Sequence, residues 1–365
     1  MAPAPHFLLI EPYYGGSHRA FIDGLQQHLD FKFTLLSLPA RKWKMRMQLA
    51  ALWVCDKIIS LAAEGKQYDG MLCSTFIDIA VLRSQLFRAG IELPAAVYFH
   101  ENQFGYPGQV TDPGQHQFTA INFTSALTAD YLAFNSRYNL DTFISGIRDY
   151  LKKAADMKLR HLVDTVIDKT SVLYPGVDFS AFDQVTASPG TNKKPVIIWN
   201  HRWEHDKNPH QFFTSLVNLS EKGLAFELII LGQRFKHQPD IFSWAQEKLK
   251  AHIIHFGYAE NRQEYANLLA RGDIIVSTAL HEFFGMAILE GVRSGCRPLV
   301  PDRLAYMELF PDVFRYPDGE FTRRLEQLIE NFVPLGKKES LQLTERFSWP
   351  AVAGAYMKWL GKMAA

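Results

Sequence analysis

The sequence has few cysteines and almost no net charge. Its three cysteines, Cys55, Cys73 and Cys296, have separations that fit neither a disulfide framework nor a zinc site. Lys plus Arg (39) nearly balance Asp plus Glu (38), so the net charge of +1 does not point to a polyanionic partner. A local basic patch could still bind nucleic acid on such a protein. No apolar run reaches the ~18 residues of a membrane span, and nothing at the N-terminus resembles a signal peptide. We therefore expect a cytoplasmic protein with no membrane span.

Strand patterns alternate with helical patterns along the whole chain, which is typical of parallel sheets with helices on both faces. In the first half the expected strands are His6–Ile10, Phe31–Ser37, Gly70–Ser74, Ala95–Phe99, Tyr131–Asn135 and Ser171–Leu173. In the second half they are Val196–Asn200, Glu227–Gly232, Ile253–Phe256, Ile274–Ser277 and Arg297–Val300. The pattern predicts an α/β protein made of two doubly wound, Rossmann-like domains that face a central cleft.

A stretch with linker composition, Ser188–Lys194, separates the two halves. We place an acceptor-side domain at residues 1–187 and a donor-binding domain at residues 188–345. Residues 346–365 contain an amphipathic helix that we expect to pack back on the first domain. A helix that covers the second domain instead is the alternative.

The most informative stretch is HEFFGMAILEG, His281–Gly291, which follows a strand and opens a helix. Backbone N–H groups of Phe284, Gly285 and Met286 at a helix N-terminus favour an anion. A carboxylate on each side, Glu282 and Glu290, suggests hydrogen bonds to the hydroxyls of a sugar and of a ribose. For an isolated pair of glutamates, a helix cap and a solvated surface residue would be the simpler explanation.

A second element agrees with this one. Arg202 and Lys207, five residues apart in NHRWEHDKNP, follow the first strand of the second half. Arg offers a planar fork to phosphate oxygens and Lys a compact charge. Both elements in this order resemble the Arg-x4-Lys and Glu-x7-Glu motifs of retaining GT-B glycosyltransferases. The resemblance implies a nucleotide-sugar donor, a pyrophosphate held by the two cations, and no metal or other cofactor. It also implies a nucleobase near Gly257 and Tyr258.

Several residues of the first half follow expected strands at their carboxyl ends. His100 stands where the family has a histidine that contacts the transferred sugar, so we expect His100, Arg202, Lys207 and Glu282 to be catalytic. Gly16, in the turn after the first strand, is a candidate donor contact. Candidate acceptor contacts are Glu101, Asn102, Gln103, Asn135 and Ser136.

Basic residues surround Trp43 in the segment LPARKWKMRMQ, where Arg41, Lys42, Trp43 and Lys44 are candidate contacts to a phosphate backbone and stacked bases. A solvated face of the following helix is the alternative. A second basic cluster, Arg148–Arg160, is interpreted as a polar helix.

Four strings of the first half narrow the resemblance: IEPYYGGSH, LPARKWK, YFHENQ-x-x-YP and FNS. Together they resemble the tRNA-queuosine mannosyltransferases. This resemblance implies GDP-mannose as donor and the cyclopentenediol of queuosine, in the anticodon of aspartate tRNA, as acceptor.

Two other functions remain open at this point. One is a glycosyltransferase that acts on a lipid headgroup or a small metabolite. The other is a non-catalytic RNA-binding protein on a GT-B scaffold, which would have no need for the donor residues.

Overall fold

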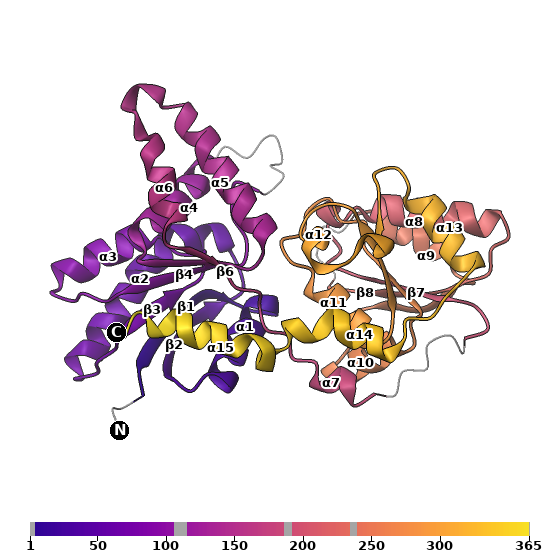
Figure 1. Ribbon diagram of the computed structural model, residues 1–365, viewed down its shortest axis with the longest axis horizontal. Coiled ribbons are helices and arrows are strands. Elements are labelled where there is room, and N and C mark those ends of the chain that lie inside the picture. The colour runs from indigo at the N-terminus through magenta and orange to yellow at the C-terminus, as the bar shows by residue number, and fades with distance from the viewer. Residues whose placement is uncertain (1–3, 106–114, 186–191, 234–238, 365) are drawn as a thin grey trace. The chain divides into compact units, whose positions relative to one another are not determined.

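Two six-stranded parallel sheets organise the chain (Figure 1). The computed structural model describes residues 4–105, 115–185, 192–233 and 239–364. Contacts between Cα atoms divide the chain into unit 1, Met1–Val177 with Trp349–Ala365, and unit 2, Asp178–Ser348. The α/β class predicted from the alternating pattern is confirmed.

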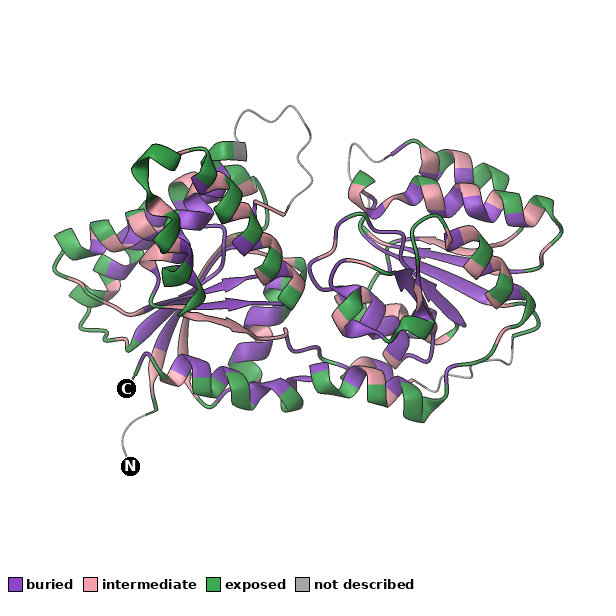
Figure 2. Ribbon diagram, turned by 45° about the horizontal axis from the view of Figure 1, so that its top comes forward, coloured by how far each residue is buried: buried purple, intermediate pink, exposed green. Residues whose placement is uncertain are grey.

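The sheet of unit 1 has the strand order β2-β1-β3-β4-β5-β6, and all its neighbouring strands are parallel. Its strands are β1 His6–Tyr14, β2 Lys32–Pro39, β3 Gly70–Cys73, β4 Ala95–Phe99, β5 Tyr131–Phe134 and β6 Thr170–Val172. Every residue of β3 and β4 is buried, as expected where helices cover both faces of a parallel sheet (Figure 2).

Helices cover both faces of this sheet. They are α1 Gly16–His28, α2 Trp43–Ala63, α3 Ile79–Arg88, α4 Gln115–Thr128, α5 Arg137–Lys152, η1 Ala155–Met157, η2 Leu159–His161, α6 Leu162–Ile167 and α15 Trp349–Gly361. Apolar side chains of α2 to α6 form one core cluster with the sheet, and those of α1 and α15 form another with its opposite face. Two side chains cap helices locally, because Asp78 accepts from the N–H of Val81 and Ser136 from that of Asn139.

The last helix, α15, is built into the core of unit 1 through Trp349. This side chain is 2% exposed and packs against two glycines, Gly24 of α1 and Gly176. A β-carbon at Gly24 would lie 2.1 Å from Cε2 of the Trp349 indole, and one at Gly176 would lie 2.2 Å from its Cδ2. The His28 ring stacks on the same indole at 5.5 Å. Glycine at these two positions therefore makes room for the tryptophan.

We expect Gly24→Ala to destabilise unit 1 by about 1–3 kcal/mol, because the added methyl group forces Trp349 out of its site. The matched control is Gly354→Ala in α15, where a β-carbon meets no atom within 4 Å. That substitution should stabilise the protein by about 0.5–1 kcal/mol, since alanine favours the helix. Chemical denaturation of both variants measures the difference, and equal midpoints would contradict the packing argument.

The sheet of unit 2 has the order β12-β11-β10-β7-β8-β9, again with parallel neighbours. Its strands are β7 Val196–Asn200, β8 Glu227–Leu231, β9 Ile253–Gly257, β10 Ile274–Val276, β11 Arg297–Pro301 and β12 Arg315–Tyr316. The two-residue strand β12 was not predicted, because it is too short to show a period.

The helices of unit 2 also lie on both faces of its sheet. They are α7 Ser180–Asp183, η3 His205–Lys207, α8 Pro209–Glu221, α9 Ile241–Lys248, α10 Arg262–Ala270, α11 Met286–Arg293, α12 Tyr306–Leu309, η4 Asp312–Phe314, α13 Phe321–Glu330, α14 Lys337–Thr344 and η5 Glu345–Phe347. Helices α8, α9 and α13 share one core cluster with the sheet, and α10, α11 and α14 lie on the other face (Figure 1).

The chain enters unit 2 earlier than the linker composition predicts. The predicted boundary, between residues 187 and 188, lies outside the described residues, and unit 2 already begins at Asp178. Two contacts attach this segment to unit 2. The carbonyl oxygen of Asp178 accepts a hydrogen bond from Arg262 at 3.0 Å, and the carboxylate of Asp183 pairs with Arg293 at 2.6 Å. Unit 2 therefore begins about ten residues before the predicted boundary.

The return to unit 1 comes at Trp349, three residues after the predicted position of 346. Arg346 donates a hydrogen bond of 2.6 Å to the carbonyl oxygen of Glu308, and the Phe347 ring packs against Phe284 at 5.5 Å. These contacts keep residues 346–348 in unit 2. Among the described residues, no helix combines the length and apolar character needed to cross a bilayer.

Candidate active site

Lys207 occupies the centre of a buried polar group in unit 2. It ends η3, soon after β7, and its side chain is 7% exposed. Its Nζ donates to the carbonyl oxygen of His281 at 2.6 Å and lies 3.3 Å from Oε2 of Glu282 and 3.1 Å from Oδ2 of Asp206. The structure therefore brings together two of the predicted residues, Lys207 and Glu282, and adds Asp206.

The charges of this group stabilise one another. Burial by itself would lower the pKa of Lys207, but the carboxylates of Glu282 and Asp206 raise it. Burial likewise opposes ionisation of Glu282, yet the Lys207 ammonium holds the pKa of that carboxyl below its ordinary value. Burial, followed by the charge of Lys207, lowers the pKa of the neighbouring His201 to about 4. At neutral pH the group is a cation between two anions, beside a neutral imidazole.

Arg202 lies apart from this ion pair. Its side chain is 48% exposed and forms a salt bridge of 3.1 Å with Glu204. The pair Arg202 and Lys207 thus gives one exposed and one buried cation.

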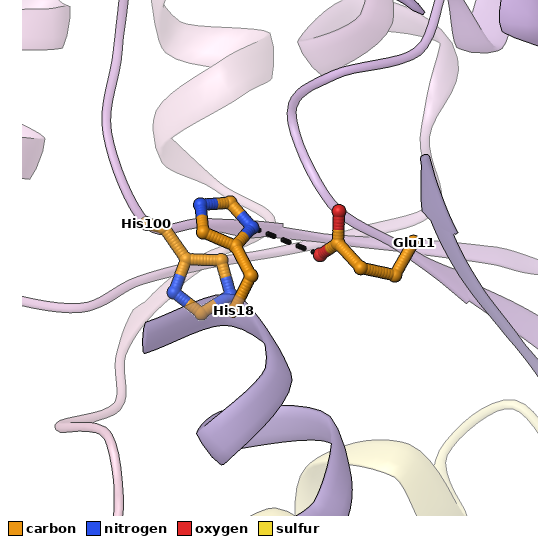
Figure 3. A group of neighbouring side chains, drawn as sticks. All are labelled: Glu11, His18 and His100. Atoms are coloured by element: carbon orange, nitrogen blue, oxygen red, sulfur yellow. Dashed lines mark hydrogen bonds and ion pairs between the residues drawn. The ribbon is translucent and has the colours of Figure 1, made fainter. Parts of the chain in front are cut away.

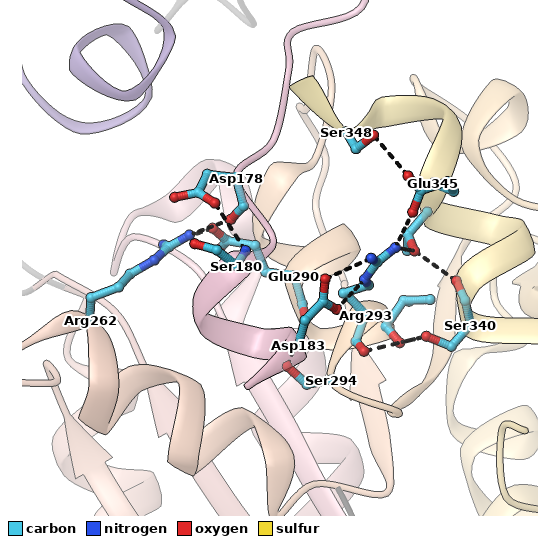
Figure 4. Close-up of polar contacts among 12 residues, drawn as sticks. Asp178, Ser180, Asp183, Arg262, Glu290, Arg293, Ser294, Ser340, Glu345 and Ser348 are labelled. Carbon is cyan, nitrogen blue, oxygen red and sulfur yellow. Dashed lines mark hydrogen bonds and ion pairs between the residues drawn. The ribbon is translucent and has the colours of Figure 1, made fainter. Parts of the chain in front are cut away.

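Glu290 belongs to a different network, which is centred on the start of α10. One carboxylate oxygen is 3.0 Å from Nη1 of Arg262 (Figure 4). The other is 2.6 Å from the hydroxyl group of Tyr265. That hydroxyl group accepts a hydrogen bond from Nδ2 of Asn200 at 2.6 Å. Glu290 is 8% exposed, so it is not a solvated surface residue, which would be the simpler explanation for an isolated glutamate. The two glutamates of the motif therefore lie in separate polar networks.

Gly285 shapes the loop between these two networks. It precedes α11 with a φ of +100°, and a β-carbon here would lie 2.9 Å from the Tyr306 ring. Only glycine fits this backbone comfortably. Phe284 is buried against Phe347, and Met286 begins the helix, half-buried. The backbone at the N-terminus of α11 is therefore held in one conformation by its packing.

The remaining donor candidates of unit 2 lie at the end of β9. Gly257 closes the strand with a φ of +154°, and Tyr258 follows with 70% of its surface exposed. An exposed aromatic ring beside a strand end is available for stacking. No contact joins these two residues to Lys207.

Unit 1 contains a second buried charge cluster, at the carboxyl ends of β1, β3 and β4 (Figure 3). Both ring nitrogens of His18 face carboxylates: Nδ1 is 2.9 Å from Glu11, and Nε2 is 3.3 Å from Glu101. Each nitrogen therefore carries a proton. Burial alone would lower the pKa of His18, but the charges of Glu11 and Glu101 raise it to about 10. His18 is thus a buried imidazolium.

Neighbouring groups fix the two carboxylates. Oε1 of Glu11 accepts from the N–H of Tyr13 at 2.8 Å and from the hydroxyl of Ser74 at 3.0 Å. The hydroxyl of Thr75 donates to Glu101 at 3.2 Å. Glu11 is completely buried, whereas Glu101 keeps 14% of its side chain exposed. Of the two, Glu101 is the one that a substrate can reach.

His100 lies against this cluster and is neutral. Its ring centroid is 4.1 Å from that of His18. Burial, followed by the positive charge of His18, holds the pKa of His100 well below its ordinary value. Within the described part of the chain, its buried Nε2 has no hydrogen-bond partner. An unsatisfied buried nitrogen of this kind is suited to a hydroxyl group of a ligand.

Side-chain atoms of Glu11, His18 and His100 come within 4.8 Å of one another, close enough to hold a metal ion. A ligating imidazole needs a lone pair on the nitrogen that faces the ion. In the structure both nitrogens of His18 face carboxylates, so these side chains form an ion-pair cluster.

Four of the predicted acceptor contacts are hydrogen-bonded inside unit 1 instead. Asn102 is fully buried, and its amide nitrogen donates to the side-chain oxygen of Asn139 at 2.7 Å. Asn135 donates to the carbonyl oxygen of His100 at 2.7 Å. Ser136, also fully buried, caps α5, and the N–H of the buried Gln103 donates to Asn122. These residues position the His100 loop, and the side chains of Asn102 and Ser136 are fully buried.

The predicted basic segment lies at the start of α2. Arg41, Lys42 and Lys44 are exposed. Trp43 packs on Phe118 at 5.1 Å, so its ring is partly used by the core and only its outer part is open. Gly16, at the start of α1, has a φ of +53°, and its surroundings are open. The segment is a surface of three cations around a fixed aromatic ring.

Sequence reasoning missed Glu11, His18, Asp206, Arg262 and Tyr265. A signal existed for Glu11, because an acidic residue follows four apolar residues without a turn between them. None existed for Arg262 and Tyr265, whose contacts to Glu290 span 28 and 25 residues.

Two family models match the chain. One is described as the N-terminal part of tRNA-queuosine alpha-mannosyltransferase and matches residues 6–177. The other is described as glycosyl transferases group 1 and matches residues 182–331. The matches fall in unit 1 and unit 2, respectively.

Known proteins agree with these models. A Drosophila melanogaster tRNA-queuosine alpha-mannosyltransferase is 36% identical over 354 residues, which cover 90% of this chain and 92% of the relative. Among solved structures, Anabaena HepE in complex with UDP-glucose has a TM-score of 0.71 at 15% identity and covers 98% of this chain and 99% of its own. The catalytic domain of Arabidopsis thaliana starch synthase IV, bound to ADP and acarbose, has a TM-score of 0.69 at 12% identity and covers 99% of this chain and 100% of its own. These structures share the fold, and it is the relative at 36% identity that shows the family: the chain belongs to the tRNA-queuosine alpha-mannosyltransferases.

Proposed function

We propose that this protein transfers mannose from GDP-mannose to the queuosine of aspartate tRNA in the cytoplasm. The transfer retains the configuration of the anomeric carbon and needs no divalent metal. The observation that carries the proposal is the buried Lys207–Glu282 pair, with Glu290 held eight residues further on, in a chain of this family. A protein that only binds RNA has no use for these groups.

Unit 2 holds the donor in this proposal. Lys207 and the exposed Arg202 bind the diphosphate, together with backbone N–H groups at the N-terminus of α11. Glu282, fixed by Lys207 at 3.3 Å, accepts hydrogen bonds from hydroxyls of the mannose. Glu290, fixed by Tyr265 and Arg262, accepts them from the ribose. Tyr258 stacks on the guanine.

The reaction follows from this binding. The bond between the anomeric carbon and the phosphate oxygen breaks, and a queuosine hydroxyl oxygen forms the new bond on the same face of the sugar. A phosphate oxygen of the departing GDP takes the hydroxyl proton. Lys207 and Arg202 offset the growing negative charge of the diphosphate, which is the work that a divalent metal performs in other transferases.

Unit 1 holds the acceptor. Nε2 of His100 meets a substrate hydroxyl, because it is buried and has no partner within the described residues. Glu101 is held by His18 and Thr75 and orients the diol of queuosine. Arg41, Lys42 and Lys44 bind phosphates of the anticodon arm, and the outer edge of Trp43 contacts a base.

Incubation of the protein with radiolabelled GDP-mannose and tRNA, with and without queuosine, tests the proposal. We expect label only in the queuosine-bearing tRNA and an α-linkage in the nucleoside released from it. Label in a lipid or in a small metabolite would show that the acceptor is not tRNA, while the protein would still be a glycosyltransferase. Binding of tRNA without transfer from any nucleotide sugar would overturn the activity itself.

A further inference from the structure

A second basic surface stands on the hairpin formed by α5 and α6 in unit 1, which reaches away from the sheet (Figure 1). We call residues 148–161 the hairpin tip. It contains five Lys and Arg, all exposed, against two Asp, a net charge of +3 in a chain whose total is +1. The tip is therefore a local excess of positive charge on a chain of almost no net charge.

Most of these cations are not used by the fold. Lys152 pairs with Asp149 at 2.7 Å on an exposed surface. Within the described residues, none of the other four, Arg148, Lys153, Lys158 and Arg160, takes part in a salt bridge. Exposed like charges repel one another and contribute nothing to folding.

Apolar packing accounts for part of the tip, because the half-buried side chains of Tyr150 and Leu159 pack against the core cluster of unit 1. The short helices η1 and η2, Ala155–His161, have no buried residue, while Leu151 before them and Val163 after them are in the core. Helix α5 and the six-residue helix α6 are thus held in the core at the ends next to the tip. The exposed cations of the tip take no part in this packing.

The backbone of the tip gives an independent indication. Lys158 has a φ of +54° and a ψ of +38°, in the left-handed region that favours glycine or asparagine. Lys42, in the basic segment of α2, has a φ of +54° and a ψ of +47°, and its side chain makes no capping hydrogen bond. Both basic surfaces therefore place a lysine in a backbone region where glycine would be more stable.

The two surfaces lie on the same face of the sheet, because α2, α5 and α6 share one core cluster that excludes α1 and α15. Helix α5 has 16 residues, a length of about 24 Å. We propose that the hairpin tip binds the phosphate backbone of the tRNA, at a distance from the modified nucleoside. The inference rests on the proposed function.

An RNA helix fits the tip better than a membrane does. Membrane-binding helices need a broad apolar face beside their cations. The tip offers the single exposed apolar side chain of Met157. Exposed cations at a tight turn are instead suited to phosphates, which dominate the recognition of double-stranded RNA.

A triple variant, Lys153→Ala with Lys158→Ala and Arg160→Ala, tests the tip. For queuosine-bearing tRNA we expect a Kd about 10-fold higher at 0.15 M salt. The slope of log Kd against log salt should fall by roughly 2–3, about one unit for each lost phosphate contact. KM for tRNA should rise with it, while kcat at saturating tRNA stays unchanged. The control replaces three exposed lysines of unit 2 by alanine, Lys248, Lys250 and Lys337, and should leave the Kd unchanged.

A single substitution separates binding from folding. Lys158→Gly relieves the left-handed backbone, so we expect a Tm about 2 °C higher together with weaker tRNA binding. A merely structural lysine would change stability alone. Unchanged affinity in this variant would overturn the inference.

The outcomes distinguish this inference from the proposed function. If the wild type transfers no mannose to queuosine-bearing tRNA, the proposed function fails. If it does so and the triple variant has the wild-type Kd and salt slope, the hairpin proposal alone is overturned. Loss of flotation with phosphatidylserine vesicles, with tRNA binding intact, would also overturn it and point to a membrane surface.

Discussion

Lys207→Ala is expected to lower kcat by about 10²–10³, the effect of removing one preorganised charge from the transition state. The ammonium lies in a buried site, where its attraction to a departing diphosphate is screened little by water. KM for the donor should change less, because Arg202 and the N-terminus of α11 are still present. Steady-state kinetics with GDP-mannose measure both constants.

The same substitution also removes the partner of Asp206 and Glu282, so a fall in stability must be separated from a loss of chemistry. The double variant Lys207→Ala with Asp206→Asn removes one of the two remaining negative charges, and it should recover Tm without recovering kcat. Lys222→Ala, which breaks an exposed salt bridge of 2.7 Å to Glu326, should leave both unchanged. A Lys207→Ala enzyme with wild-type kcat would refute the role given to this residue.

His18→Ala should destabilise unit 1 by about 3–5 kcal/mol, because it leaves Glu11 and Glu101 charged and buried without their cation. Replacing Glu11 by Gln in the same protein removes one of these charges, so the double variant should be more stable than the single one. Arg19→Ala on the same helix breaks an exposed pair and should cost less than about 1 kcal/mol. Denaturant unfolding of the wild type and these three variants gives the comparison, and a double variant no more stable than His18→Ala would contradict the ion pair.

The pH dependence has a defined sign. In the folded protein the pKa of His18 is raised to about 10 from its ordinary 6.5. The stability that it contributes is therefore fully present below pH 6.5 and is lost as the pH rises through 10. The His18→Ala protein should lack this loss, so the difference in Tm between it and the wild type should narrow from pH 6.5 to pH 10. A constant difference over this range would mean that His18 is neutral in the fold.

Local patterns predict the elements of this protein well. The strands Ala95–Phe99 and Val196–Asn200 have the bounds expected from the sequence. A run of apolar residues marks each strand, and Asn208-Pro209 marks the start of α8, because asparagine caps it and proline fits its first turn. Such signals lie within a few residues of one another, so the kind of each element and the order of the elements can be predicted without knowing which segments meet in the fold.

The partners of buried charges could not be predicted in the same way. Glu11 follows the last expected residue of its strand, and its cation, His18, is tied to a second carboxylate, Glu101, 83 residues further along. The three meet because β1, β3 and β4 are neighbours in the sheet, which no local pattern specifies. Lys207 and Glu282 were predicted as site residues only because they match the motifs of a known family.

The placement of Trp349 between Gly24 and Gly176 has a consequence for synthesis on the ribosome. Unit 1 lacks α15 until the 171 residues of Asp178–Ser348 have been translated, which takes about 10–30 s at the usual rates of elongation. During that interval, nascent unit 1 exposes the apolar surface that α15 later covers, and it is a candidate client for chaperones. A premature stop codon between residues 178 and 348 would leave the acceptor-side unit, the part translated first, without its final helix.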